Sequence, residues 1–372
     1  MPKNTTLRNL RISRIKSRFE LLISHKIPHV FPVLLTALSL LPFLSGCTPK
    51  NDLNSTLSES ISVPGPVTEY LRASEPVSQN CSDSSLQTAA RSNPYPDLSV
   101  PTYLTRIDGT YFLVDCYHNQ IIYHDNLDDP LSAWKVMTDE IDKGHTLAGD
   151  GDVYLVDDTE QNRVLIFEKQ GDIYAHTQTF SEIGNRPHYI VYDAPTDTFY
   201  AWSSMSGEMY LFRHNADDTR MYLTEIRRIS SLDQVYVRSF TILGNEIYFV
   251  SGNASIIRAS LDTFEILEIY PVPDSMAGMI QLTRIQDYFY LTVSTDITGN
   301  QDYATILRTK DLHDLAENKY EDIYEYFVGG GTPYYITQLD NTYYLTEHRL
   351  PGHSLWSFCV ENNQITDVEA VY

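Results

Sequence analysis

Apolar and polar positions along the chain follow a short pattern that occurs six times. In each copy an apolar segment ends at a turn that contains Asp, Gly or Asn, and a second segment rich in Tyr, Phe and Val follows. Two such segments around a turn are typical of a hairpin of antiparallel strands. Five copies have the same length and the third has three additional residues at its turn. The copies are residues 103–115, 145–157, 188–203, 239–251, 281–293 and 335–347.

The spacing of the copies indicates how the units assemble. The copies start 42, 43, 51, 42 and 54 residues apart, which is typical of one four-stranded propeller blade. One blade cannot bury both faces of its sheet alone, so the units must pack side by side in a closed ring. We therefore predict an all-β fold over residues 100–372, a six-bladed β-propeller of four-stranded antiparallel blades around a water-filled channel. Third strands are expected at 120–123, 163–167, 208–212, 255–259, 304–308 and 354–360, and weaker fourth strands at, for example, 133–137 and 365–371.

The second copy and its continuation, residues 145–168, resemble an NHL repeat. The matching features are the turn at Asp150 and Gly151, the strand at 153–157, and the Asn-Arg-Val sequence at 162–164. The third copy keeps a proline before its first strand but lacks the aspartate and the Asn-Arg pair, and the last three copies match more loosely. The resemblance implies a propeller but little about chemistry, because this fold serves lyases, lactonases and binding scaffolds alike.

The first 46 residues predict a signal peptide. The apolar run at 30–44, interrupted by Pro32 and Pro42, is too short to span a bilayer but fits a secretory signal. The Leu-Ser-Gly-Cys sequence at 44–47 then resembles the lipobox of bacterial lipoproteins. The resemblance implies that the Cys47 sulfur receives a diacylglyceryl group and that Cys47 becomes the new N-terminus. A plain secretory signal with an incidental cysteine is the alternative.

Residues 47–99 predict the lipidated cysteine and a flexible tether. Residues 48–99 contain eleven serines and six prolines, with few long apolar side chains. Residues 67–71 could add a strand to the folded domain. The expected location is the bacterial cell membrane or envelope, outside the cytoplasm, where a tether would hold the propeller away from the lipid.

Composition supports a folded core and argues against one class of partner. The chain has 42% hydrophobic, 12% aromatic and 20% charged residues, with 27 tyrosines. Its 27 basic and 49 acidic residues give a net charge of −22. Such a surface repels phosphate backbones, so we expect no nucleic acid partner. Separately, we expect the protein to be a monomer. With Cys47 lipidated, at most one disulfide remains, either Cys81–Cys359 or Cys116–Cys359.

The residues that open the innermost strands are the candidate ligand site. The loops that lead into these strands would open onto one face of the channel. Aromatic, imidazole, hydroxyl, amide and guanidinium groups at this level suit a small polar ligand, although they could equally be ordinary residues of a wet channel. The candidates are Tyr103, His145, His188, Arg238, Ser239, Gln281 and Tyr335, with Arg186 and Tyr334 beside them.

A metal site is a further hypothesis. His145 and His188 would come from adjacent blades at the same level and could hold one divalent ion, with Glu347 or His348 as a third ligand. No HxxxH or CxxC spacing supports such a site. Apart from this possible divalent metal, we expect no cofactor.

The second strands end in a partial set of carboxylates, at Asp115, Asp157 and Glu347. They could bind calcium or act as a base, but an aspartate at such a position more often caps the following turn. No G-x-S-x-G sequence and no phosphate loop is present. The Glu, Asn and Asp that a propeller lactonase would need cannot be assigned.

These observations predict a cell-envelope lipoprotein whose propeller binds an extracellular small polar molecule, glycan or peptide at the channel mouth. Whether it is an enzyme is open, with binding favoured over catalysis. The alternatives are a metal-assisted lyase or lactonase that uses His145 and His188, and a protein-binding scaffold. The scaffold would work through the blade rims and the insertions at 296–303 and 309–325.

Overall fold

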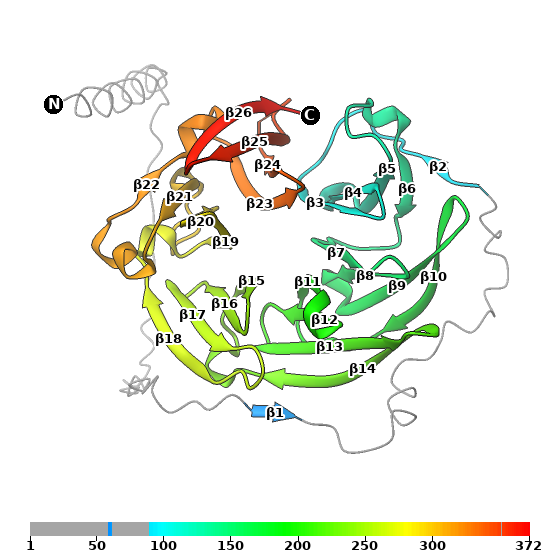
Figure 1. The fold of residues 1–372 in the computed structure, drawn as a ribbon, viewed down its shortest axis with the longest axis horizontal. Coiled ribbons are helices and arrows are strands. Elements are labelled where there is room, and N and C mark those ends of the chain that lie inside the picture. Colours follow the sequence, from blue (N-terminus) through cyan, green and yellow to red (C-terminus); the bar gives the residue numbers. More distant parts are fainter. Residues whose placement is uncertain (1–58, 62–88, 351) are drawn as a thin grey trace, which may run out of the picture. The chain divides into compact units, whose positions relative to one another are not determined.

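The computed structural model of the protein describes residues 59–61, 89–350 and 352–372. Their strands form six antiparallel sheets around a common centre (Figure 1), which confirms the predicted all-β, six-bladed β-propeller. The predicted signal peptide, Cys47 and most of the predicted tether lie outside the described residues. No helix in the described part of the chain is long and apolar enough to cross a membrane.

We number the sheets as blades 1 to 6 in chain order and give the strands of each from the innermost outward. Blade 1 contains β3 (Pro101–Ile107), β4 (Thr110–Asp115), β5 (Gln120–His124) and β6 (Lys135–Thr138). Blade 2 contains β7 (Leu147–Gly149), β8 (Val153–Asp158), β9 (Arg163–Gln170) and β10 (Ile173–Phe180). Blade 3 contains β11 (Pro187–Asp193), β12 (Thr198–Ser203), β13 (Glu208–Asn215) and β14 (Asp218–Arg228).

The remaining three blades have the same order. Blade 4 contains β15 (Val237–Leu243), β16 (Glu246–Ser251), β17 (Ser255–Ser260) and β18 (Ile266–Pro271). Blade 5 contains β19 (Met279–Ile285), β20 (Tyr288–Val293), β21 (Thr305–Thr309) and β22 (Glu321–Asp322). Blade 6 contains β23 (Thr332–Leu339), β24 (Thr342–His348), β25 (Leu355–Glu361) and β26 (Gln364–Ala370).

Two short strands from the predicted tether extend the outer edges of blades. β1 (Glu59–Ile61) pairs with β14, and β2 (Arg91–Ser92) pairs with β6. The predicted boundary at residue 100 therefore lies after the first residues that pair with the propeller. The segment 67–71, predicted to add a strand, lies outside the described residues.

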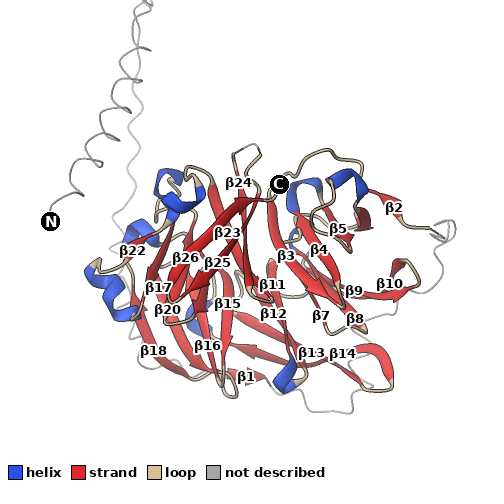
Figure 2. Cartoon of the chain, turned by 45° about the horizontal axis from the view of Figure 1, so that its top comes forward, coloured by secondary structure: helices blue, strands red, loops and turns tan. Residues whose placement is uncertain are grey.

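Short 3-10 helices occupy the connections at the margins of the sheets (Figure 2). They are η4 (Cys116–His118), η5 (Leu131–Ala133), η6 (Thr159–Gln161), η7 (Ala194–Thr196), η8 (Ser230–Leu232), η9 (Asp274–Met276), η10 (Gln301–Tyr303), η11 (Leu312–Glu317) and η12 (Tyr324–Phe327).

Burial along the strands follows from the packing of blade on blade. Every residue of β8 is buried, because neighbouring blades cover both faces of a second strand. The outermost strand β26, in contrast, has no buried residue. Apolar clusters fill the spaces between blades, and in one of them the rings of Phe112, Tyr154 and Tyr174 join blades 1 and 2. Packing between blades thus accounts for many of the tyrosines.

The turn between β3 and β4 shows why the hairpins carry Asp-Gly sequences. Asp108 and Gly109 both have positive φ, 48° and 80°. A two-residue hairpin turn with two positive φ angles matches the right-handed twist of its strands, and Asp-Gly tolerates it best. The turn therefore fixes the register of the hairpin, which pairs Ile107 with Thr110.

Blades 1 and 6 close the ring without exchanging a strand. At the centre, the Thr346 hydroxyl donates to the Thr102 carbonyl at 2.7 Å. At the outside, the Trp134 indole N–H donates to the Tyr372 hydroxyl at 3.1 Å, and this hydroxyl is 2.6 Å from the Leu127 carbonyl. Side-chain hydrogen bonds and the apolar cluster around Trp134 therefore hold the first blade to the last.

Candidate functional site

A cavity of about 290 Å³ lies at one mouth of the channel, where the innermost strands begin and the second strands end. All six blades or the loops between them contribute to its wall. The lining residues are Val100, Cys116, Tyr117, Lys143, His145, Glu160, Arg186, Tyr236, Arg238, Ile280, Ser294, Thr295, Gln301, Thr332, Tyr334 and His348. We call this cavity the mouth.

Three aromatic rings form a stack on the inner side of the mouth. The rings of His145 and His188 are 3.8 Å apart with an interplanar angle of 24°. The Tyr334 ring is 6.0 Å from His145 at 20°. The sequence correctly places the two histidines next to each other, but in the structure they meet face to face.

Hydrogen bonds fix the protonation of His145. The Thr159 hydroxyl is within 2.9 Å of both a carboxylate oxygen of Asp157 and the Pro187 carbonyl, which can only accept. It therefore accepts from the Nδ1–H of His145, at 3.0 Å. This leaves Nε2 of His145 unprotonated, 3.9 Å from the Cys116 Sγ.

His188 uses both ring nitrogens within the protein. Its Nδ1 is 3.0 Å from the Arg238 carbonyl, which can only accept, so Nδ1 carries the proton. Its Nε2 then accepts from the Tyr236 hydroxyl at 3.1 Å. His188 therefore ties blade 3 to blade 4 and does not line the mouth.

Both histidines are neutral at physiological pH. Burial lowers the pKa of His145 to about 3, and the positive charges of Arg186 and Arg238 add to the effect. The pKa of His188 is also well below its usual value, first because of burial and then because of His145. The stack consequently offers aromatic surface and hydrogen bonds but no charge.

The charged side chains around the mouth are mostly cationic. Lys143, Arg186 and Arg238 line it, against the single carboxylate of Glu160. Glu160 is held by Arg186 at 2.5 Å. Arg238 lies over the Tyr236 ring, with its guanidinium carbon 4.7 Å from the ring centroid.

Other predicted ligand residues connect neighbouring blades. The Ser239 hydroxyl donates to the Ile280 carbonyl at 2.5 Å, and Gln281 makes two hydrogen bonds to the backbone of Ile336. Thr102 likewise donates to the His145 carbonyl at 2.8 Å. These side chains link the innermost strands around the ring rather than lining the mouth.

Tyr103 and Tyr335 lie deeper in the channel. Their rings meet edge to face at 5.9 Å, and Tyr189 contacts both. Phe240 packs on Tyr189 in turn. Aromatic rings from four blades thus fill the hub below the mouth, where the sequence had predicted a water-filled channel. Of the seven predicted ligand residues, His145 and Arg238 line the mouth.

The geometry of the histidine pair offers no shared point for a metal ion. The lone pairs of the ring nitrogens lie in the ring planes. Because the two rings are stacked and nearly parallel, these lone pairs run side by side and do not converge on one point. Glu347 is occupied by the Trp356 indole N–H at 2.8 Å and by the Tyr324 hydroxyl. The described residues contain no group of three or more His, Cys, Asp or Glu side chains placed to hold a metal. Binding of a metal ion by His145 and His188 stays a prediction.

Two of the carboxylates that end the second strands, Asp115 and Asp157, hold the loop before the innermost strand of their own blade. Asp115 accepts the backbone N–H of Ser99 at 2.7 Å, and Asp157 accepts those of His145 and Thr146 at 2.9 and 2.6 Å. Their role as backbone caps is as predicted, but the capped N–H groups precede the hairpin instead of following it. This arrangement positions His145 at the mouth.

The predicted Cys116–Cys359 disulfide is absent, and both cysteines are free. Cys116 is buried at the start of η4 beside the mouth, whereas Cys359 lies in the third strand of blade 6. Burial raises the pKa of the Cys116 thiol to about 12, so it stays protonated. Cys81 lies outside the described residues.

Sequence reasoning missed several mouth residues, among them Tyr117, Lys143, Glu160 and Tyr236. Tyr117 and Glu160 lie in the 3-10 helices that follow second strands, and Lys143 and Tyr236 lie in the loops that lead into innermost strands. Position along the chain is one signal for such residues. Val100, Arg186 and Tyr236, which all line the mouth, each immediately precede an innermost strand. The residue before the innermost strand thus reaches the mouth in blades 1, 3 and 4, a position that the sequence pattern could have indicated.

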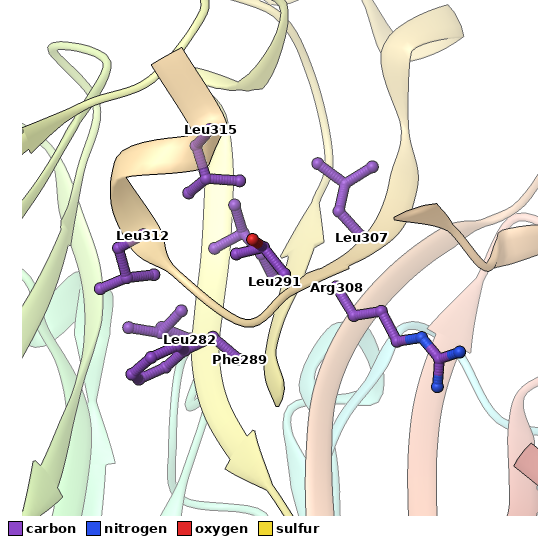
Figure 3. A pocket seen from close by; sticks show the side chains of 8 residues that line it. Leu282, Phe289, Leu291, Leu307, Arg308, Leu312 and Leu315 are labelled. Atoms are coloured by element: carbon purple, nitrogen blue, oxygen red, sulfur yellow. The ribbon is translucent and has the colours of Figure 1, made fainter. Parts of the chain in front are cut away.

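A second, apolar gap lies within blade 5, where leucine side chains converge (Figure 3). It leaves no room for a water molecule. Arg308 points away from the leucines, and its Nε donates to Glu321 at 2.7 Å. We interpret the gap as part of the core. The surrounding leucines are Leu282, Leu291, Leu307, Leu312 and Leu315.

No protein-family model and no curated protein matches the sequence. Solved structures do match. A putative 6-phosphogluconolactonase from Bacteroides uniformis is 13% identical, with a TM-score of 0.52, over 73% of this chain and 85% of that chain. A periplasmic gluconolactonase from Pseudomonas aeruginosa is 12% identical, with a TM-score of 0.51, over 72% and 84%. A catalytically inactive virginiamycin B lyase from Staphylococcus aureus with quinupristin is 15% identical, with a TM-score of 0.50, over 75% and 86%. At these identities the similarity shows that the chain has the β-propeller fold, and the NHL-like repeat stays a prediction.

Proposed function

We propose that the protein is a monomeric cell-envelope lipoprotein whose propeller binds an extracellular small polar molecule, glycan or peptide in the mouth. The observation that carries this proposal is the cavity of about 290 Å³ in which residues from all six blades converge. Ligand sites are concave, with a few polar groups among aromatic and apolar side chains. The mouth fits this description through Tyr117, Tyr236, Tyr334 and His145.

Backbone conformation at the mouth supports the proposal. Val100, Lys143 and Arg186 line it from three successive loops, and all have positive φ, 60°, 57° and 63°. Such angles are unfavourable for residues other than glycine, most of all for a β-branched valine. Strained backbone of this kind often occurs at ligand sites.

The ligand proposal is tested by a thermal-shift screen of the full-length protein in detergent. The probes are N-acetylglucosamine, glucose, succinate, a set of dipeptides, and zinc, calcium and magnesium salts. A saturable rise in melting temperature is expected for at least one sugar, peptide or organic acid, because ligands that bind only the folded state stabilise it. Tyr334→Phe and Arg238→Gln should reduce that rise. A rise that both variants leave intact would place binding elsewhere and overturn the proposal.

Anchoring through Cys47 is supported by the Leu-Ser-Gly-Cys sequence at 44–47 and by the apolar run before it. Under this proposal the lipid on Cys47 attaches the chain to the bacterial membrane. The propeller then lies outside the cytoplasm, because the predicted secretory signal at 1–46 would export the chain.

Lipidation makes a direct prediction. Cells that express the full chain and are fed an alkyne fatty acid should label the wild-type protein and the Cys81→Ser control. Cys47→Ser should lose the label and leave the membrane fraction, because only a thiol forms the thioether to the diacylglyceryl group. Equal labelling of Cys47→Ser would contradict the anchor.

A metal-assisted lyase or lactonase is the second candidate function. It is supported by the neutral imidazole of His145, whose Nε2 is unprotonated in the mouth, and by the lactonases and the lyase among the similar structures. Elemental analysis of the purified protein tests it. A stoichiometric metal that is lost in His145→Gln would favour this candidate, whereas a metal-free protein that gains no activity on metal addition would count against it.

The scaffold alternative is supported by exposed apolar side chains around the mouth. They lie in connections that lead into innermost strands or out of second strands, on the mouth face. They are Tyr95, Tyr117, Ile297, Tyr303, Tyr326 and Val328.

A further inference from the structure

The mouth has a charge opposite to that of the protein as a whole. The chain carries 49 acidic and 27 basic residues, yet the mouth has three cationic side chains and one carboxylate. Arg186 and Glu160 neutralise each other at 2.5 Å. Among the side chains that line the mouth, Lys143 and Arg238 therefore remain as the net charge.

Lys143 and Arg238 are held in place without being neutralised. Among the described residues, neither forms an ion pair with a carboxylate. The Lys143 Nζ is 4.3 Å from the centroid of the Tyr117 ring and 3.4 Å from the Asn119 amide oxygen. The Arg238 guanidinium lies over Tyr236, and its Nη1 donates to the Met279 carbonyl at 3.3 Å. Aromatic faces therefore orient both cations, and each retains unused N–H donors.

The Tyr334 hydroxyl is a third unused donor. Tyr334 lines the mouth and is only 8% exposed. In the described part of the chain, no group forms a hydrogen bond with its hydroxyl. The hydroxyl oxygen is not among the described buried side-chain atoms that lack a partner, so it opens onto the mouth and can donate a hydrogen bond to water or to a ligand. The ring is fixed by its stack on His145 and its edge-to-face contact with Tyr335.

The histidines add no positive charge to the mouth, and the Asp157 carboxylate, 3.9 Å from His145 Nδ1, is held by backbone N–H groups. Because the pKa values of both His145 and His188 are lowered, the stack contributes no charge of its own. The positive charges of Lys143 and Arg238 both act on His145 and so reach the same part of the mouth.

We infer that the mouth takes an anionic ligand, a small molecule that carries a carboxylate or phosphate group. Arg238 and Lys143 bind the anion, and the Tyr334 hydroxyl donates a hydrogen bond to the ligand. Charge-assisted hydrogen bonds from cations in a partly buried site are stronger than those between neutral groups. This inference rests on the proposed function, because it specifies the ligand class of the same site.

Calorimetric titration of the full-length protein with matched probes tests the inference. The carboxylate arm compares succinate with succinamide and glucuronate with glucose, and the phosphate arm compares glucose 1-phosphate with glucose. The anionic member of at least one pair should bind about tenfold tighter or more. Its advantage should shrink between about 50 and 500 mM salt because ions screen the charges. The arm with the larger difference identifies the anion.

Matched variants show whether the mouth cations cause the difference. Arg238→Gln and Lys143→Gln should each weaken binding of the anion about tenfold and leave the neutral member unchanged. Arg284→Gln and Lys135→Gln are the controls, because these cations lie over the rings of Phe289 and Tyr123 but do not line the mouth. The controls should bind as the wild type does.

Two results would overturn the inference. If neutral probes bind as tightly as anionic ones, and Tyr334→Phe weakens both, the mouth is the ligand site but does not select anions, so the proposed function stands alone. If no anionic probe binds, or if every mouth variant binds like the wild type, selection of an anion by the mouth is refuted. If probes bind but no mouth variant changes their binding, the proposed function is refuted as well.

Discussion

Replacing Asp157 with alanine should lower the free energy of unfolding by about 3–5 kcal/mol. The Asp157 carboxylate is fully buried and accepts hydrogen bonds from the backbone N–H groups of His145 and Thr146 and from the hydroxyls of Thr146 and Thr159. Alanine would leave two buried N–H groups without an acceptor. Urea unfolding of the full-length protein at pH 7.5 measures the effect.

Asp152→Ala is the control for this prediction. Asp152 lies on the same blade but is exposed, so its replacement should change the free energy of unfolding by less than about 0.5 kcal/mol. Asp157→Asn should fall between the two, because its amide retains one acceptor oxygen. If Asp157→Ala lost no more stability than the control, the carboxylate would not hold the loop before the innermost strand.

The second large effect is a loss of stability in acid that comes from the buried histidines. The pKa of His145 is lowered to about 3 and that of His188 is lowered well below its usual value, mainly by burial. In the unfolded chain both titrate near pH 6.5. Each histidine therefore stabilises the fold fully above about pH 6.5, and this contribution falls by about 1.4 kcal/mol per pH unit as the pH drops below that value.

Asp157 partly offsets this trend. Burial raises its pKa to about 6, which is above the unfolded value, so the fold binds a proton here that the unfolded chain does not. Its contribution therefore increases stability as the pH falls from about 6 towards 4.

Comparison of wild type with His188→Gln isolates the histidine effect. The variant cannot take up the proton, so its loss of stability relative to wild type should be smaller at pH 5.0 than at pH 7.5, by up to about 2 kcal/mol. His313→Gln, at a side chain that is 62% exposed, is the surface control measured at the same two pH values. A His188→Gln deficit that stays constant would mean that His188 takes up a proton as readily in the folded protein as in the unfolded chain.

The sequence predicts the propeller well because each hairpin is encoded locally. In the hairpin of β3 and β4, the apolar pattern and the Asp108-Gly109 turn together define register and length. The repeat period then sets the number of blades. The closure of the ring was predictable only in outline, because the contacts of Trp134 with Tyr372 join residues 238 positions apart.

The candidate site was harder to predict because side-chain direction and loop conformation decide which residues reach the mouth. Ser239 and Gln281 were expected to open innermost strands, but each is the third residue of its strand, and its side chain turns sideways to the next blade. Lys143 reaches the mouth from a loop in which its own φ is 57°. The spacing of the cysteines along the sequence likewise does not show that Cys116 lies at the mouth as a free thiol.

The central claim is that the ligand binds in the mouth and not on the exposed apolar side chains around it. We call these side chains the rim, and they include Tyr326 and Val328. Calorimetric titration of the probe with the largest thermal shift tests it on two double variants. Arg238→Gln with Tyr334→Phe alters the mouth, and Tyr326→Ser with Val328→Ser alters exposed rim residues. We predict that the mouth variant binds at least about thirtyfold more weakly than wild type, roughly 2 kcal/mol, while the rim variant binds as wild type does. Full binding by the mouth variant together with loss of binding by the rim variant would contradict the claim.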